Sequence, residues 1–170
     1  MPYHSAQHPF PPIYNEHSRI LILGSFPSVK TRQMGFYYGH RQNRFWPLMS
    51  ALLSIHPTLA ATDPPRAESA LLTHHIALWS SIASCDIIGS SDSSIRNVVP
   101  TDLAPIFADA QIKHVFCNGG ASFRYYKKYQ TDRPDVAVTQ LPSTSPANAR
   151  WSLDNLIDAW QVILPYLKED

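Results

Sequence analysis

The sequence predicts an α/β fold of three layers, in which helices cover both faces of a central four-stranded parallel sheet. Four short apolar runs recur along the chain, each followed by turn-forming residues, as is typical of buried strands. Segments with apolar residues at helical spacing lie between these runs. Alternating strands and helices favour a parallel sheet that is buried on both faces.

The four expected strands cover residues 20–23, 76–79, 114–117 and 136–141. Helices are expected over residues 43–54, 65–74, 101–107 and 122–128, and a last one opens at Trp151. Thr101 is expected to cap the third helix, and Ser122 to begin the fourth. Ligands of such sheets bind beyond the carboxyl ends of the strands, so we expect the functional site among residues 24–28, 80–86, 118–122 and 142–148.

The chain length of 170 residues fits one compact domain. Residues 1–17 are rich in proline, which favours extended or irregular backbone, so we expect an N-terminal arm there. Residues 18–170 are expected to form the single domain, and no internal repeat divides them.

Composition narrows the class of protein. The apolar fraction of 44% and the charged fraction of 16% are those of a soluble globular protein, and the net charge of +1 argues against extended coating of nucleic acid. Cys85 and Cys117 are too few for a cysteine-ligated cluster, and no His-Glu-x-x-His motif is present, so we expect no metal and no cofactor. No apolar stretch is long enough to span a membrane, and we expect a cytoplasmic monomer.

The segment 35–46, Gly-Phe-Tyr-Tyr-Gly-His-Arg-Gln-Asn-Arg-Phe-Trp, is the most informative motif. Three aromatic residues lie between two glycines, where the chain can turn and expose a ring to stack on a nucleic-acid base. Phe45 and Trp46 are expected to be core residues of the next helix. Arg41 and Arg44 suit either a solvated face or a phosphate contact. This mixture of residues points to nucleic-acid chemistry.

Asn43 stands where the next helix should begin, and two roles are open for it. One is an N-cap, a frequent use of asparagine. The other is to hold a water molecule through its amide. Because an amide cannot take a proton as a carboxylate does, it suits a reaction in which the leaving group departs early and water adds late. Cleavage of an N-glycosidic bond is such a reaction.

Three further segments follow expected strands. The turn Gly24-Ser25-Phe26-Pro27-Ser28 is either an ordinary strand exit or a set of N–H and hydroxyl groups for a phosphate or a base edge. Asn118-Gly119-Gly120 allows close packing of a helix on a strand, or an open helix N-terminus. The stiff loop 142–148 is either a rigid surface turn or a hydroxyl-rich wedge for a duplex groove. If the reaction needs a carboxylate base, Asp86 and Asp92 are the candidates.

Together these motifs resemble the uracil-DNA glycosylase superfamily, whose mismatch-specific uracil/thymine branch has a Gly-x-Asn-Pro-Gly turn and a Gly-Phe…His-x-x-Asn-Arg-Phe-Trp block. Here residues 24–28 and 35–46 have the same spacing, and residues 141–145 match the closing loop of the family. The superfamily carries its water-activating Asp or Asn at the third position of the first turn, where this chain has Phe26. With that departure the sequence is similar to the hypoxanthine-DNA glycosylase branch, in which the asparagine of Gln-Asn-Arg-Phe-Trp, here Asn43, supplies the amide.

The resemblance implies a uracil-DNA glycosylase-like fold and a monofunctional DNA-deoxyinosine glycosylase of base excision repair, with no metal or iron–sulfur cluster. Such an enzyme flips hypoxanthine out of DNA and hydrolyses its N-glycosidic bond. Asn43 is then the catalytic residue, and Tyr38 stacks on the base. The other residues expected to bind the base are Gly24, Ser25, Phe26 and Asn118. The residues expected to contact DNA are Ser143, Thr144, Ser145, Ala147 and Asn148.

Three alternatives stay open at this point. Uracil, or a G:U or G:T mismatch, is a second target, because base preference depends on fine orientation of side chains and peptides. Phe26 at the usual catalytic position also leaves open a module that binds damaged or single-stranded DNA without hydrolysis. An α/β enzyme that acts on free nucleosides is the third.

Overall fold

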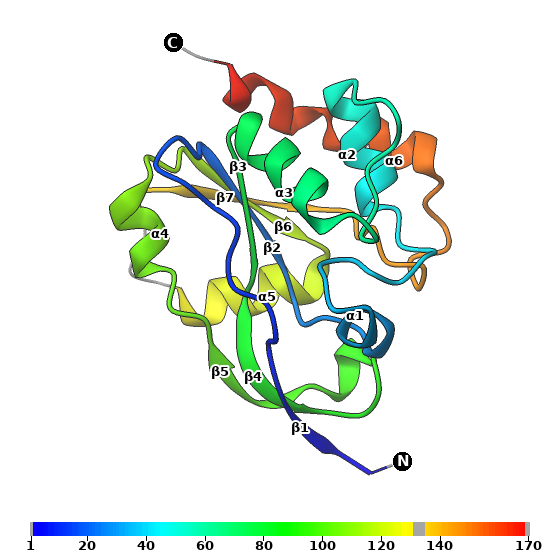
Figure 1. The fold of residues 1–170 in the computed structure, drawn as a ribbon. Helices are drawn as coiled ribbons and strands as arrows, with labels where there is room; N and C mark the ends of the chain where they lie inside the picture. Colours follow the sequence, from blue (N-terminus) through cyan, green and yellow to red (C-terminus); the bar gives the residue numbers. More distant parts are fainter. Residues whose placement is uncertain (1, 131–134, 169–170) are drawn as a thin grey trace.

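The structure, a computed structural model, describes residues 2–130 and 135–168 and contains the predicted parallel sheet (Figure 1). Its strands are β2 (Ile20–Gly24), β3 (Ile76–Ser80), β6 (His114–Asn118) and β7 (Ala137–Leu141), in the order β3-β2-β6-β7. Every neighbouring pair is parallel. Each expected strand is therefore confirmed to within one residue at either end.

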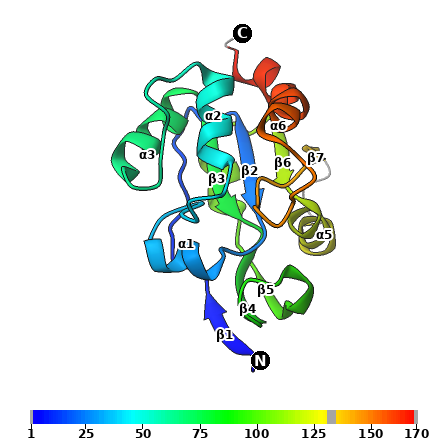
Figure 2. The same cartoon turned by 90° about the vertical axis from the view of Figure 1, so that its right-hand side faces the viewer.

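Helices cover both faces of this sheet, as predicted (Figures 1 and 2). On one face lie α2 (Phe45–Leu53), α3 (Pro64–Thr73) and α6 (Leu153–Trp160), which η2 (Gln161–Leu167) continues. Their apolar side chains pack on the alternate strand residues that include Ile20, Ile22 and Phe116 in one buried cluster. The apolar residues whose helical spacing predicted these helices are thus the residues that pack against the sheet.

The opposite face is covered by α4 (Ala104–Asp109) and α5 (Gly120–Tyr129). A second cluster there joins Leu21, Leu23 and Val115 of the strands to Ile106 and Tyr126. Because the side chains of a strand alternate between faces, a strand buried on both sides reads as a continuous apolar run. This explains the apolar runs of β2, β3 and β6; β7, at the edge of the sheet, is only partly buried and carries Thr139 and Gln140.

A second sheet, which was not predicted, extends from one end of the first. It consists of β1 (His4–Gln7), β4 (Ile82–Ile87) and β5 (Arg96–Pro100), antiparallel in the order β1-β4-β5. From the sequence, residues 80–86 are expected to follow the second strand as part of the site, but only Ser81 separates β3 from β4. No turn residue marks the start of β4, and one of its two partners, β1, lies more than seventy residues before it.

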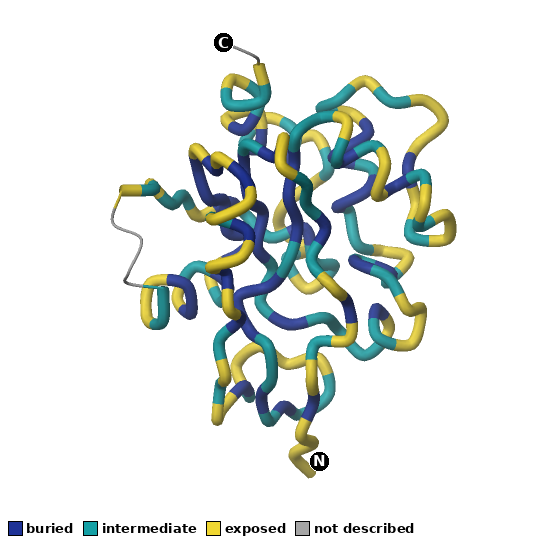
Figure 3. Tube along the Cα trace, turned by 60° about the vertical axis from the view of Figure 1, so that its left-hand side comes forward, coloured by how far each residue is buried: buried dark blue, intermediate teal, exposed yellow. Residues whose placement is uncertain are grey.

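The N-terminal arm packs on the domain along its length. Phe10 and Ile13 retain only 9% and 3% of their surface and belong to the main core. Ile13 also exchanges two backbone hydrogen bonds with Leu78, of 2.9 and 2.8 Å. Figure 3 shows the buried segments at the centre of the molecule, with exposed residues in the loops and at the first strand. The prolines that predicted an extended arm are compatible with this pairing.

Two expected helix starts need correction. Thr101 does not cap α4, because its hydroxyl donates to the carbonyl of Ser80; the Oδ1 of Asp102 accepts from Ala104 N instead. Ser122 lies inside α5, which begins at Gly120, and its hydroxyl donates to the carbonyl of Leu23 at 2.7 Å. Both hydroxyls serve tertiary contacts with the sheet, which local sequence does not reveal.

The described residues contain no helix that is both long enough and apolar enough to cross a membrane.

Trp160 supplies a test of the packing. Its side chain is fully buried, and its Nε1 donates to the carbonyl of Pro142 at 2.9 Å. Trp160→Ala is expected to lower the free energy of unfolding by about 3–5 kcal/mol, because it leaves a large cavity and an unpaired carbonyl. Val162, two residues later, is 48% exposed and serves as the control. Val162→Ala is expected to change the free energy of unfolding by less than about 0.5 kcal/mol. Urea denaturation of both variants measures the difference; equal losses would contradict this packing.

Candidate active site

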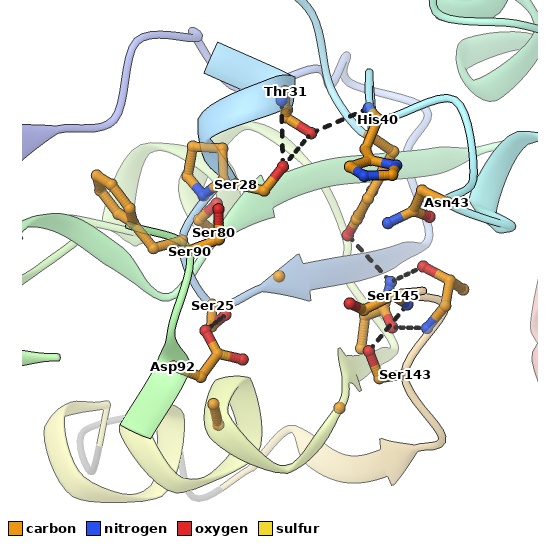
Figure 4. A pocket seen from close by; sticks show the side chains of 18 of the residues that line it. Ser25, Ser28, Thr31, His40, Asn43, Ser80, Ser90, Asp92, Ser143 and Ser145 are labelled. Atoms are coloured by element: carbon orange, nitrogen blue, oxygen red, sulfur yellow. Dashed lines mark hydrogen bonds between the residues drawn. The ribbon is translucent and has the colours of Figure 1, made fainter. Parts of the chain in front are cut away.

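A cavity of about 460 Å³ opens at the carboxyl ends of β2, β3 and β6 (Figure 4). Its volume is in the range of sites that hold one small molecule or one nucleotide base. Every site residue predicted from the sequence lines this cavity except Asn148, which lines an adjacent groove. The sheet topology therefore collects side chains that are more than a hundred positions apart in the chain.

The ring of Tyr38 forms one wall. It stacks on Phe45 with 4.1 Å between ring centroids and 21° between planes, so only its other face can meet a ligand. A Cβ at Gly24 would lie 3.1 Å from the Tyr38 hydroxyl, which means that a larger residue there would displace the ring. Burial raises the pKa of the Tyr38 phenol, and the ring is neutral at any physiological pH.

Asn118 joins the sheet to both the aromatic wall and the closing loop. Its Nδ2 donates to Tyr38 Oη at 3.2 Å and to Thr144 Oγ1 at 3.0 Å, and its Oδ1 accepts from Thr144 N at 3.0 Å. Both N–H groups of the amide are thus engaged within the protein. The prediction that Asn118 reads the base edge is limited by this geometry to the remaining lone pair of Oδ1.

Asn43 faces the cavity from the start of α2 (Figure 4). The N-cap of α2 is Arg44, so Asn43 lies one residue before the predicted position. Its Oδ1 nevertheless accepts from Phe45 N at 2.9 Å and so satisfies a free donor at the helix start. No other described residue is bonded to the amide, which leaves one lone pair of Oδ1 and both N–H groups for a ligand. The two roles considered for Asn43 are compatible in one conformation.

His40 lies beside Asn43 and was not singled out from the sequence. Asn43 N donates to the carbonyl of His40 at 2.8 Å, which closes a turn with both side chains toward the cavity (Figure 4). The Nδ1 of His40 accepts from Gln42 N at 3.1 Å, so in the neutral ring Nε2 carries the proton. The sequence feature that could have identified His40 as a site residue is its position inside the segment 35–46.

An apolar wall closes the cavity on the side of the N-terminal arm. Phe26 is buried there, and the ring of His8 meets it edge-on at 6.3 Å between centroids. The pKa of His8 is lowered to about 4, because burial disfavours the charged ring. Phe26, which is expected to bind the base, therefore belongs to an apolar wall of the cavity. The contribution of His8 could not be foreseen, since it belongs to the proline-rich arm.

The loop 142–148 is held in place by Arg44. The Nη2 atom of Arg44 donates to the carbonyls of Ser145 and Asn148 at 2.8 and 3.0 Å, and Nη1 donates to the carbonyl of Trp151. The backbone N of Arg44 donates to the carbonyl of Thr144 at 3.1 Å. Of the two roles considered for Arg44, neither a solvated face nor a phosphate contact describes it, because its guanidinium is occupied by the loop.

Within that loop the predicted DNA contacts separate into two groups. Thr144 is fully buried and bonded to Asn118, so its hydroxyl cannot meet a phosphate in this conformation. Ser143, Ser145 and Ala147 line both the cavity and the neighbouring groove of about 550 Å³. Asn148 lines the groove, although its Nδ2 donates to the carbonyl of Ser143. The expectation that Thr144 contacts DNA is therefore not met in this conformation. Local sequence could not reveal this, because the contact with Asn118 is formed only in the folded protein.

The two carboxylates considered from the sequence have different surroundings. Asp92, in η1 (Asp92–Ser94), lines the cavity, and its Oδ1 accepts from Ser25 Oγ at 3.1 Å. Asp92 is exposed on η1; desolvation nevertheless raises the pKa of its carboxyl, while the Ser25 hydrogen bond and the charge of Arg124 oppose the rise. Asp86 lies on β4 outside the cavity lining and accepts from Asn97 at 2.7 Å. Among the described residues, no group of three or more His, Cys, Asp or Glu could hold a metal ion.

Residues 11–164 match the family model of the uracil DNA glycosylase superfamily. A hypoxanthine DNA glycosylase from Methanosarcina barkeri is 29% identical over 157 residues, which are 89% of this chain and 93% of that protein. A hypoxanthine DNA glycosylase from Methanosarcina acetivorans is also 29% identical, over 91% of this chain and 95% of that protein. The solution NMR structure of a candidate uracil DNA glycosylase from M. acetivorans superimposes with a TM-score of 0.78 at 27% identity, and covers 93% of this chain and 96% of that one.

Arg44 provides a test of how the loop is held. Arg44→Ala is expected to lower the free energy of unfolding by about 1.5–3 kcal/mol, because charge-assisted bonds to several carbonyls are lost. Arg41→Ala is the control, since Arg41 is exposed and bonds to no other described residue. Hydrogen exchange should quicken at Thr144 N and Asn148 N in the first variant alone. Unchanged exchange at both amides would contradict the role assigned to Arg44.

Proposed function

Because this chain belongs to the uracil DNA glycosylase superfamily, we propose that it is a monofunctional DNA glycosylase that removes a deaminated base, above all hypoxanthine, from DNA. The observation that carries the proposal is the pairing of Asn43 with Tyr38 in one cavity of base size. The relatives named for hypoxanthine support the choice of base. The enzyme is proposed to act as a monomer on DNA, as a step of base excision repair.

The base enters the cavity after the nucleotide rotates out of the duplex, at a cost of a few kcal/mol that is smallest where pairing is already weak. Inside, it lies on the free face of Tyr38, which contributes about 1–3 kcal/mol of stacking. Phe26 and the neutral ring of His8 bound the cavity and exclude water from that side. In the proposed pose, with the base between the stacking surface and the apolar wall, the glycosidic bond is directed toward the cavity mouth.

Hydrolysis then needs a water molecule beside C1′. The free lone pair of Asn43 Oδ1 accepts a hydrogen bond from that water and fixes its orientation. The bond between C1′ and the base nitrogen breaks, with its electron pair going to the base. The water oxygen bonds to C1′, and the proton that it loses reaches the departed base through solvent. The products are the free base and an abasic sugar in an unbroken strand.

The loop 142–148 is the proposed DNA contact. Ser143 and Ser145 carry hydroxyls at the mouth shared by the cavity and the groove, and Ala147 and Asn148 extend along the groove. Arg44 holds their backbone from beneath, so the loop can press on the duplex without rearranging. Lys30, the one lysine among the described cavity residues, is exposed on α1 (Val29–Met34) and lacks the desolvation that activates a lysine nucleophile.

Asn43→Ala tests the proposed catalytic amide. In single-turnover reactions on a duplex with one deoxyinosine, the variant is expected to be slower by roughly 10²-fold or more, because a positioned water is lost. Gln42→Ala, which removes an exposed neighbour, is the control and should keep the wild-type rate. Strand breaks should appear only after alkali, as for a monofunctional enzyme. Wild-type speed in Asn43→Ala would refute the assignment.

Tyr38→Ala tests the stacking surface. Loss of the ring is expected to weaken binding of an inosine-containing duplex by about 5- to 150-fold, which corresponds to about 1–3 kcal/mol of stacking. Binding of an undamaged duplex should change little, because no base enters the cavity there. Fluorescence anisotropy with both duplexes measures the ratio. An equal loss on the two duplexes would point to a structural role for Tyr38 instead.

A further inference from the structure

We propose that the carboxylate of Asp92 flanks the deoxyribose of the extruded nucleotide and stabilises the positive charge that the sugar acquires as the base departs. The inference rests on the proposed glycosylase function and adds a second polar group to its chemistry. It also separates the two carboxylates between which the sequence did not decide. Asp92 would act on the sugar, and Asp86 would not.

Asp92 lies where the cavity meets the adjacent groove. The cavity and the adjacent groove share a rim, which consists of Asp92, Gly119, Gly120, Ser143, Ser145 and Ala147. Asp92 is the one charged residue in this described set. A nucleotide with its base in the cavity and its phosphates along the groove must place its sugar at this rim. The carboxylate of Asp92 is therefore at the level of C1′ and O4′.

Asp92 and Asn43 lie on opposite sides of the cavity. Figure 4 shows the carboxylate of Asp92 directed inward beside Ser25, and the amide of Asn43 on the far side. A sugar between them would have an amide on one side, suited to a neutral water, and a negative charge on the other. This division suits a reaction whose transition state carries positive charge on the sugar ring.

One hydrogen bond from Ser25 holds the carboxylate in that orientation, and two further contacts hold the loop that carries it. Ser25 Oγ donates to Asp92 Oδ1 at 3.1 Å, and the carbonyl of Asp92 accepts from Ile95 N at 3.3 Å in the turn of η1. The preceding Ser90 accepts from Val29 N at 2.9 Å, which ties the loop to the start of α1. A group fixed before the reaction stabilises charge without reorganising during it.

The chemistry is electrostatic and requires no further reactant. As the bond from C1′ to the base breaks, the electron pair leaves with the base and the sugar becomes an oxocarbenium ion. The negative carboxylate attracts that ion, and the attraction grows when bound DNA excludes water from the rim. Water then adds to C1′ from the side of Asn43. The same carboxylate repels DNA phosphates, so it cannot be a residue that supplies affinity.

The surroundings of Asp92 determine its response to pH. Arg124 on α5 and the Ser25 hydroxyl favour the ionised carboxyl, while desolvation favours the neutral form and raises the pKa. The charge of Asp92 also acts on Cys85 of β4, and Lys30 and His40 line the same cavity. If the ionised form is the active one, the rate falls as pH drops through the pKa of Asp92.

The test is the single-turnover rate of Asp92→Asn and Asp86→Asn on a duplex with one deoxyinosine, measured across pH beside the binding affinity. Asp92→Asn is expected to lose roughly 10²-fold in rate, to bind DNA at least as tightly as wild type, and to lose the acidic limb of the pH profile. Asp86→Asn should match wild type. Ser25→Ala should move the acidic limb to higher pH, because a bond that favours the carboxylate is gone. Melting temperatures check that each variant is folded.

The outcomes separate the two proposals. If the wild type is active and the single-turnover rate of Asp92→Asn is within twofold of the wild-type rate, the role of Asp92 is overturned and the glycosylase function stands. An equal rate loss in Asp92→Asn and Asp86→Asn, or weaker DNA binding by Asp92→Asn, would make the effect structural and overturn it as well. A wild type that releases no base from any deaminated lesion would overturn both.

Discussion

The amide of Asn118 is the interaction on which the rest of the site depends. From the end of β6 it bonds to the Tyr38 hydroxyl, to the Thr144 hydroxyl and to Thr144 N, so one side chain links sheet, aromatic wall and closing loop. Asn118 and Thr144 are buried, and leaving their polar groups unpaired would cost about 1–3 kcal/mol. These bonds join the walls of the cavity before a ligand enters. Arg44 extends the same constraint, since it bonds to the loop carbonyls from the start of α2.

Phe26 changes how such a site can work. A phenylalanine at the third position of the first turn gives the cavity an apolar wall, and polar chemistry has to come from elsewhere in the chain. Asn43 faces the cavity from the start of α2, and Asp92 from the connection between β4 and β5. An amide that orients water and a carboxylate that stabilises charge together divide the work that one acidic residue could do alone. Our two proposals assign these two roles to Asn43 and Asp92.

The sequence predicted what local patterns encode. The four parallel strands and the helices that cover them follow from apolar periodicity, and Tyr38 and Asn43 were identified from a dense local motif. Long-range contacts are not visible in local patterns: β4 pairs with β1, which lies more than seventy residues before it, and Arg44 bonds to carbonyls about a hundred residues away. Thr144 shows the same limit, because only the fold reveals that Asn118 buries its hydroxyl. Nor could sequence spacing choose between Asp86 and Asp92, which differ in whether they face the cavity.

The central claim is that this cavity hydrolyses the glycosidic bond of a deaminated base. Its most direct test is mass-spectrometric measurement of the free base released from matched duplexes that contain hypoxanthine, xanthine, uracil, mispaired thymine or adenine. We predict that hypoxanthine is released most rapidly and that adenine is not released. A chain that binds the inosine duplex but liberates no free base would contradict the account and indicate a binding module.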